Sequence, residues 1–235
     1  MRSFYIFAVL FFIGNLGFAQ VNDEPEKASN YSEPKRKGIL EYGIQHSISF
    51  STLLGQGETI SEGIYEVQLN SVGTRFTPSF GGFGNYFLGE NLSIQLEVLY
   101  AFYGAHFNRE NVIYQDLGYF TSTDRVNYNT QYVKTPVSLK VYPVKKMYLL
   151  GGGYFSVLTH AKVYDGAYFS GGRAEYVDLN NIDVGVLGGF GFDLKIVDVA
   201  FRYNYGFSNV FLNKGNANLH NSVFELMAHW KIGRN

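Results

Sequence analysis

Large apolar residues recur at every second position through much of this chain. In residues 92–102, LSIQLEVLYAF, alternate side chains from Leu92 onward are large and apolar, and those between are mostly small or polar. A period of two indicates a β-strand whose two faces meet different surroundings. Eight segments show it, each long enough for the ~9 to 11 residues of a tilted membrane strand. The predicted strands are Ile39–Leu53, Thr74–Leu88, Leu92–His106, Gln131–Pro143, Met147–Ala161, Ile182–Leu194, Val197–Phe207 and Asn221–Ile232.

The composition agrees with a β-protein in an apolar environment. Of the 235 residues, 46% are hydrophobic and 17% aromatic, and the 27 Gly against 5 Pro favour twisted β-structure. Charged residues make up 17%, below the roughly 25% of an average soluble protein. The net charge of -1 provides no basic field for nucleic acid. Because the chain has no Cys, disulfides, thiolate metal sites, Cys nucleophiles and lipid-modified cysteines are excluded.

The N-terminal residues have the pattern of a secretory signal followed by a polar tail. Arg2 precedes an apolar run from Phe4 to Phe18, so residues 1–19 are predicted to be a signal peptide that is cleaved after Ala19. The run of about fifteen residues is shorter than the ~20 that a membrane-spanning helix needs. Residues 20–38 are polar and of mixed charge, which predicts a disordered periplasmic tail ahead of a barrel domain at residues 39–235.

The connections between the predicted strands alternate between long and short. Tight turns are expected at Gly89–Asn91, Pro143–Lys146 and Lys195–Ile196, and the connections between them are longer. All the long connections therefore share one end of the molecule, as in transmembrane barrels with short periplasmic turns and long extracellular loops. Since an even number of strands returns the chain to its starting side, both termini are expected to be periplasmic.

The two faces of the predicted strands differ in size and charge. One face is bulky and nearly free of charge, whereas the other is mostly small with isolated charged residues. A soluble lipocalin-type barrel has the same period with the faces reversed. The smaller face has too few charges for a water-exposed surface, but it suits the crowded lumen of an eight-stranded barrel. We therefore predict an all-β fold, an eight-stranded antiparallel up-and-down transmembrane β-barrel with its bulky face toward lipid.

Ten charged residues fall on the face that is predicted to line the lumen. Buried charges persist only when they are paired and hydrogen-bonded, so we expect a structural network, with Glu97 near Lys140 and Glu41 near Lys231. The same charges could line a narrow ion path, but a packed plug is favoured because so small a barrel is filled by its own side chains. The predicted network comprises Glu41, Arg75, Glu97, Lys134, Lys140, Asp183, Asp193, Arg202, Glu225 and Lys231.

Aromatic residues near the strand ends predict girdles at the two membrane surfaces. Pro78 and Pro136 lack an N–H and lie within strands, so a bulge is expected at each. His46 falls on the lipid face, either near an interface or because a bulge shifts the register by one residue. The periplasmic girdle is predicted to contain Tyr86, Phe87, Tyr142, Tyr148 and Trp230, and the outer girdle Phe50, Phe76, Phe102, Phe155, Phe207 and Phe224.

The middle of the chain resembles a known family. Residues 130–158, TQYVKTPVSLKVYPVKKMYLLGGGYFSVL, contain an aromatic residue, a Pro followed by apolar residues, a Lys and a Tyr, a short turn and a Gly-rich strand. This arrangement resembles the central signature of the PorT-like outer-membrane β-barrel proteins, and Phe80–Ala105 and Ile182–Val210 resemble the hairpins on either side of it. The resemblance implies an eight-stranded barrel in a Gram-negative outer membrane, and some members serve in protein secretion.

The sequence provides little support for a catalytic, cofactor-binding or metal site, and none is predicted. His106, His160 and His220 are expected near the extracellular rim, where a barrel acylhydrolase would need one of them as base and Ser222 or Ser156 as nucleophile. Neither triad spacing nor the i, i+2 or i, i+4 spacing of strong metal ligands supports such a site. The runs GGG and GGFG lie inside strands, where Gly allows curvature rather than phosphate binding.

The functional hypothesis is a non-enzymatic outer-membrane barrel with a structural or partner-docking role in the envelope. Its expected partners are outer-membrane lipid and lipopolysaccharide, together with an envelope protein bound through extracellular loops, and not nucleic acid. The alternatives are a subunit of a protein-secretion complex, a narrow porin-like channel and a lipid acylhydrolase. Mobile loops whose Tyr, Asn, Asp and Gly residues suit adaptable contacts are expected at Gly55–Gly73, Phe107–Thr130 and Lys162–Asn181.

Overall fold

The chain divides into two units, Met1–Lys35 and Arg36–Asn235. A computed structural model describes only residues of the second unit, namely 36–56, 59–62, 65–115, 118–144, 146–165, 174–175, 179–194, 196–210 and 218–235. The predicted signal peptide and nearly all of the predicted tail therefore lie outside the described residues. Within these ranges no helix is long and apolar enough to cross a bilayer.

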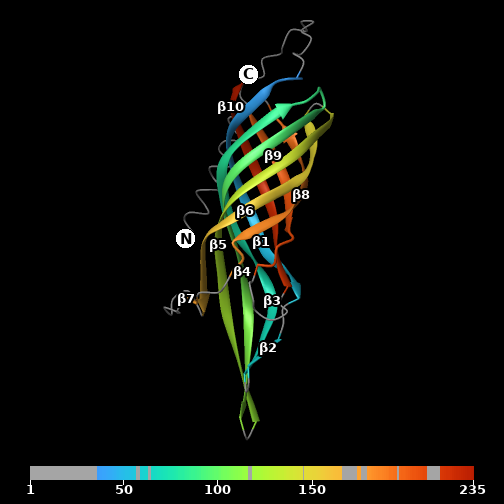
Figure 1. Ribbon diagram of the computed structural model, residues 1–235. Coiled ribbons are helices and arrows are strands. Elements are labelled where there is room, and N and C mark those ends of the chain that lie inside the picture. The colour runs from blue at the N-terminus through green and yellow to red at the C-terminus, as the bar shows by residue number, and fades with distance from the viewer. Residues whose placement is uncertain are drawn as a thin grey trace, which may run out of the picture. The chain divides into compact units, whose positions relative to one another are not determined.

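The described unit is a closed antiparallel barrel of eight strands, which confirms the predicted fold (Figure 1). Around the barrel the order is β1-β10-β9-β8-β6-β5-β4-β3, and pairing between β1 and β3 closes the ring. Two short strands, β2 (Thr59–Glu62) and β7 (Ala174–Glu175), pair with β3 and β6 outside the ring. The barrel strands are β1 (Leu40–Gln56), β3 (Tyr65–Phe87), β4 (Leu92–Gln115), β5 (Gly118–Val144), β6 (Met147–Asp165), β8 (Ile182–Asp193), β9 (Val197–Gly206) and β10 (Asn218–Arg234).

The alternating pattern separates an outer apolar face from a buried interior. In β4 the outward side chains of Leu96 and Val98 are 55% and 53% exposed. Glu97 and Leu99, which alternate with them along the strand, are each 1% exposed. Leu, Ile, Val and Phe side chains make up much of the outer face on the other barrel strands as well. The bulky face therefore points away from the barrel axis, as the sequence predicts.

The interior is less dominated by small residues than the sequence analysis expects. Among the described residues, six tyrosines are buried inside the barrel, and neighbouring strands place glycines beside the rings of two of them, Tyr148 and Tyr154. A Cβ atom at Gly191 would lie 2.5 Å from the Tyr148 ring, and one at Gly185 would lie 2.6 Å from the Tyr154 ring. Large rings thus fill the space that small residues on the next strand leave open. The buried tyrosines are Tyr103, Tyr128, Tyr132, Tyr142, Tyr148 and Tyr154.

The predicted periplasmic girdle is wrong for three of its five members. Phe87, Tyr142 and Tyr148 are at most 2% exposed and lie in one buried cluster, so they face the lumen. Local β-propensity does not distinguish the two faces, and these positions share the side of their strands that carries buried residues. Tyr86 is 44% exposed on the outside. Among the predicted outer girdle residues, Phe50, Phe155, Phe207 and Phe224 are exposed, and Phe76 and Phe102 are half-buried.

The two ends of the barrel differ in the way the strands are connected. One end, here called the turn end, carries the three short connections at residues 88–91, 145–146 and 194–196. The first described residues and the C-terminus share this end, because Leu40 and Asn235 exchange two backbone hydrogen bonds of 3.1 and 3.0 Å. All the other connections join strand ends at the opposite end, as predicted, although that between β4 and β5 spans only residues 116–117 (Figure 1).

At that opposite end, here called the extended end, strands replace much of the predicted loops. The β4–β5 ladder continues from the Ala105–Tyr128 pair to the Gln115–Gly118 pair. β3 begins at Tyr65 and pairs with β2 and β4, and β6 continues to Asp165. The expectation of loops throughout 55–73 and 107–130 was therefore wrong, because the backbone pairing of adjacent strands propagates beyond the apolar band.

Pro78 and Pro136 have different effects on strand pairing. The register between β3 and β4 shifts between Thr74 and Ser79, in agreement with the bulge expected at Pro78. The prediction of a bulge at Pro136 was wrong. The β4–β5 ladder passes from the Leu96–Val137 pair to the Leu99–Lys134 pair without a change of register. The missing N–H interrupts pairing there but does not add a residue.

His46 keeps the expected register and faces outward. Its ring is exposed and lies 5.5 Å from that of Trp230, in an edge-to-face arrangement. No register shift separates His46 from its neighbours in either ladder of β1, since the one irregularity lies between Tyr42 and Gly43. Of the two explanations for His46, the structure therefore favours a true outward position.

Two adjacent glycines of β6 should respond differently to the same small substitution. In Gly152→Ala, the new Cβ would lie 2.0 Å from the backbone oxygen of Val137, so β5 and β6 must move apart. We expect a loss of about 1–3 kcal/mol in the free energy of unfolding, the usual cost of overpacking. The measurement is urea unfolding of the barrel in lipid vesicles. Gly151→Ala is the matched control, because nothing lies within 4 Å of its Cβ, and an equal loss in both variants would contradict the argument.

Candidate functional site

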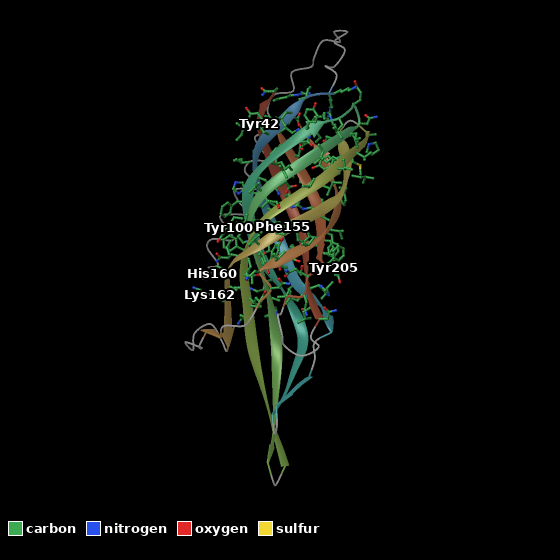
Figure 2. All side chains as sticks on the ribbon, in the orientation of Figure 1. Tyr42, Tyr100, Phe155, His160, Lys162 and Tyr205 are labelled. Carbon is green, nitrogen blue, oxygen red and sulfur yellow. The ribbon has the colours of Figure 1, made fainter. Side chains whose placement is uncertain are left out.

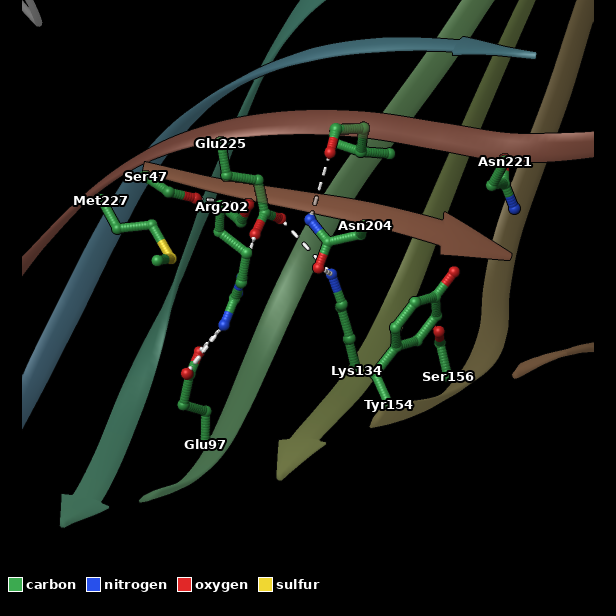
Figure 3. A network of polar contacts seen from close by, with 12 residues as sticks. Ser47, Glu97, Lys134, Tyr154, Ser156, Arg202, Asn204, Asn221, Glu225 and Met227 are labelled. Atoms are coloured by element: carbon green, nitrogen blue, oxygen red, sulfur yellow. Dashed lines mark hydrogen bonds and ion pairs between the residues drawn. The ribbon is translucent and has the colours of Figure 1, made fainter. Parts of the chain in front are cut away.

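Arg202 on β9 is the centre of a charged layer that crosses the lumen (Figure 3). Its Nη1 donates to both carboxylate oxygens of Glu97 on β4, at 2.8 and 2.9 Å, and its Nε donates to Glu225 Oε2 on β10 at 2.7 Å. None of the three residues is more than 2% exposed. Charge-assisted bonds of this length are strong, and the guanidinium holds its two carboxylates from different sides.

Lys134 on β5 completes this layer. Its Nζ lies 3.4 Å from Glu225 Oε1, donates to Asn204 Oδ1 at 3.0 Å, and stands 4.6 Å from the centre of the Tyr154 ring. We call Glu97, Lys134, Arg202 and Glu225 the central layer. It contains two positive and two negative groups from four strands, so it is balanced in charge.

A second group of charges lies at the turn end of the lumen. Lys231 Nζ lies 2.5 Å from Asp193, 2.8 Å from Asp198 and 3.5 Å from Glu41. Lys140 Nζ lies 3.6 Å from Asp198. These contacts join β1, β5, β8, β9 and β10 at the end where their connections are shortest.

Arg36 closes this second group from just before the first strand. Its Nη1 lies 3.1 Å from Asp193 Oδ2, and its guanidinium carbon is 5.4 Å from the centres of both the Phe87 and the Tyr142 rings. A cation over an aromatic face is attracted by the ring quadrupole. The inward position of these two rings therefore has a structural use that the sequence analysis does not anticipate.

The structure places the predicted network residues in different surroundings. The expected Glu41–Lys231 contact is present at 3.5 Å. Glu97 forms its ion pair with Arg202 and Lys140 with Asp198, so the closeness of Glu97 to Lys140 stays a prediction. The partners of groups across the lumen depend on the stagger of the strands and not on their order in sequence.

Two other predicted members, Asp183 and Arg75, lie outside the central layer and the second group of charges. Asp183 is 3% exposed and accepts hydrogen bonds from Tyr154 Oη at 3.1 Å and Asn221 Nδ2 at 2.9 Å. Arg75 is only half-buried, and its guanidinium bonds to Asn129, which alternates with the lumen-facing Tyr128 and Thr130 on β5. This contact joins β3 to β5 near the extended end, although the ladder partner of Arg75 on β1 is the buried Ser51.

The sequence analysis did not include Asp198 in the network. Asp198 shares the side of β9 that carries Arg202 and Asn204, so its parity along the strand could have identified it. Gln95 precedes Glu97 by two positions and donates to its Oε1 at 2.9 Å.

Within the described ranges, the contacts of Ser156, Ser222, His160 and His220 are with other groups and not with one another. Ser156 is fully buried in the lumen and donates to the Asp183 backbone oxygen, whereas His160 is exposed on the outer face. Ser222 bonds with Tyr203 at 3.0 Å, and His220 contacts the Ser208 backbone oxygen at 3.2 Å. In the part of the chain that the structure describes, no three His, Asp or Glu side chains group as a metal site.

A closed barrel with an apolar outer face and a charged interior is the architecture of outer-membrane proteins. A family model described as "Outer membrane protein beta-barrel domain" matches residues 18–212. The chain belongs to this family. The outer membrane protein β-barrel domain accounts for most of the sequence and indicates an outer-membrane location. The narrower PorT-like resemblance stays a prediction.

Several solved barrels are similar to this member of the family. Ail of Yersinia pestis, in complex with the heparin analogue sucrose octasulfate, is 10% identical over 83% of this chain and 99% of its own, with a TM-score of 0.42. Neisserial surface protein A is 14% identical over 81% and 97%, with a TM-score of 0.40. The outer membrane protease OmpT from Escherichia coli is 10% identical over 88% and 99%, with a TM-score of 0.36. No curated protein matches the sequence.

Removal of the central cation should destabilise the barrel strongly. In Arg202→Met, Glu97 would lose its bidentate partner and Glu225 one of its two cationic partners in a buried layer. We expect a loss of about 3–5 kcal/mol in the free energy of unfolding, the range for breaking a buried ion pair from one side. Urea unfolding in lipid vesicles measures it. Lys146→Gln, an exposed cation at the turn end, should change stability by less than about 0.5 kcal/mol. A comparable small loss in Arg202→Met would show that the layer does not hold the strands.

Proposed function

We propose that this protein is a sealed, non-enzymatic barrel that serves the outer membrane as a structural element and docks a partner at its extended end. The observation that carries the first part is the central layer, in which Arg202 contacts two carboxylates from different strands directly. Ions cross a membrane pore with water or with ligands that replace it, whereas these charges are bonded to one another. We therefore assign the ten predicted network residues, apart from Arg75, a structural role as a plug, and we add Asp198 to them.

The partner-docking role is supported by the extended end. β3, β4 and β5 continue there as paired strands, and the β4–β5 hairpin reaches Gln115 and Gly118 (Figure 1). A paired ladder provides a more ordered platform than separate loops, and its sequence contains the Tyr, Asn and Thr residues that suit adaptable contacts. An envelope protein is the proposed partner, and a protein-secretion complex is the alternative that copurification from mild detergent would reveal.

We also propose that the turn end faces the periplasm. Short connections and both ends of the barrel domain gather at this end, as is usual for outer-membrane barrels. A signal peptide at residues 1–19 and a tail at 20–38 would then precede the barrel on the periplasmic side. The extended end would project from the cell.

The proposed plug predicts that the barrel does not conduct ions. In planar bilayers at high salt, the purified barrel should show no discrete conductance steps, because the central layer joins opposite walls of the lumen. A general porin in the same bilayers is the positive control. In Lys134→Ala the layer loses one cation and the side chain that lies against Tyr154, and short openings should appear. Regular steps from the unmodified protein would support the narrow channel and reject the plug.

Single cysteines can report the orientation without background, because the chain has no Cys of its own. Asn218 at the extended end and Lys146 at the turn end are both exposed. On intact cells a membrane-impermeant maleimide should label Asn218→Cys at least about tenfold more than Lys146→Cys, and permeabilisation should equalise them, since accessible thiols of ordinary pKa react alike. The reverse preference would mean that the extended end lies in the periplasm.

A further inference from the structure

Two basic side chains lie on the outer face of β6 just beyond its apolar band. His160 and Lys162 are exposed, and Figure 2 shows them on the extended-end side of the aromatic residues Tyr100 and Phe155. From Met147 to Val157 the strand covers about 33 Å, or about 25 Å along the membrane normal at a tilt of about 40°. This matches the height of the apolar band of an outer-membrane barrel, so His160 and Lys162 both fall at headgroup level.

A β-bulge directs the side chains of His160 and Lys162 outward. Up to Leu158 the even-numbered residues of β6, such as Tyr154 and Ser156, face the lumen. The register with β5 then shifts, because Tyr132 pairs with Leu158 but Gln131 pairs with His160. Thr159 is the extra residue, and its hydroxyl donates to the Gln131 backbone oxygen at 3.0 Å. Without the bulge His160 and Lys162 would point inward, so the local structure re-aims them as bulges characteristically do.

The neighbouring amides on β5 are oriented by their own partners. Asn129 pairs with Lys162 and Gln131 pairs with His160 across the β5–β6 ladder, so the four side chains share one face. Arg75 can only donate, so its bond to Asn129 fixes the amide oxygen as the acceptor. Tyr100 Oη donates to Gln131 Oε1 at 2.6 Å. Both amide oxygens are thus engaged, and the ends of these side chains that the two bonds do not use are N–H donors.

The face therefore combines donors and positive charge. The segments that form it, Tyr100–His106, Asn127–Gln131 and Val157–Lys162, contain no Asp or Glu. An isolated surface lysine needs no ligand, but here a bulge, two oriented amides and two basic residues converge beside an aromatic boundary. Such a surface is complementary to an anionic group with several acceptor oxygens that lies in the plane of the membrane surface.

We propose that the outer face of β5 and β6 binds the phosphate groups of lipopolysaccharide through Lys162, His160, Asn129 and Gln131. With the orientation proposed above, these residues lie in the outer leaflet, where phosphorylated glycolipid is the abundant anion. The acyl chains of that lipid would rest on the apolar band below, against Phe155 and Val157. The lipid would hold the barrel at a fixed depth while leaving the hairpin of β4 and β5 free for a protein partner.

The test measures binding of purified lipid A to the folded barrel in detergent. Wild-type protein should bind bisphosphorylated lipid A about tenfold more tightly than lipid A whose phosphates have been removed, and added salt should reduce the difference. The His160→Gln/Lys162→Gln variant should lose at least about fivefold in affinity for the bisphosphorylated form, the effect of removing one interfacial cation. Lys146→Gln removes a cation from the turn end and should bind as the wild type does.

Each contrary result has a definite meaning. Equal affinity of the wild type and the double variant, or equal affinity for the two forms of lipid A, would overturn the proposal. Heat-modifiable migration on gels establishes that the variant is folded before binding is measured. The assay uses isolated protein and does not depend on orientation, so labelling of Asn218→Cys on cells tests the proposed orientation separately from the lipid site. Conductance tests the plug separately from both.

Discussion

The pairing between β1 and β3 is the contact on which the rest of the structure depends. Twelve consecutive residue pairs, from Leu40–Tyr86 to Ser51–Arg75, turn an open sheet into a closed ring. Within hydrocarbon no water is available for an unpaired N–H or C=O group, so a sheet with an edge could not remain in the membrane. Closure with eight strands also sets the width of the lumen, which is just large enough for side chains.

That narrow lumen explains the contents of the interior. Tyrosines fill it where glycines on the neighbouring strand make room, as with Tyr148 beside Gly191. The charged groups of the central layer contact partners of opposite charge. This layer balances two cations with two carboxylates. Buried ion pairs add little stability compared with apolar packing, but breaking one is costly, so such a layer specifies which strands face each other. The proposed role as a sealed structural barrel follows from this filled interior.

Because the interior is filled, the proposed contacts with lipid and with a protein partner lie on the outer surface of the barrel. The extended end continues as paired strands beyond the apolar band, and the bulge at Thr159 turns His160 and Lys162 to the outer face. The proposed lipid contact and the proposed protein contact occupy different parts of this end. A barrel with a closed interior can serve both without a change in its own shape, because neither contact requires the lumen to open.

The sequence by itself determined the eight barrel strands and the face that most of their residues occupy, because a period of two is a local property of the chain. It therefore identified Glu97, Arg202 and Glu225 as lumen residues, and parity along β9 would have added Asp198. Only the tertiary structure decided which groups meet. Glu97 and Arg202 are 105 positions apart on strands that are not neighbours, and their contact depends on the stagger of the whole barrel. The tertiary structure also decided the inward positions of Tyr142 and Tyr148, the unshifted register at Pro136 and the bulge at Thr159. Each of these follows from how adjacent strands fit together and not from the residue type alone.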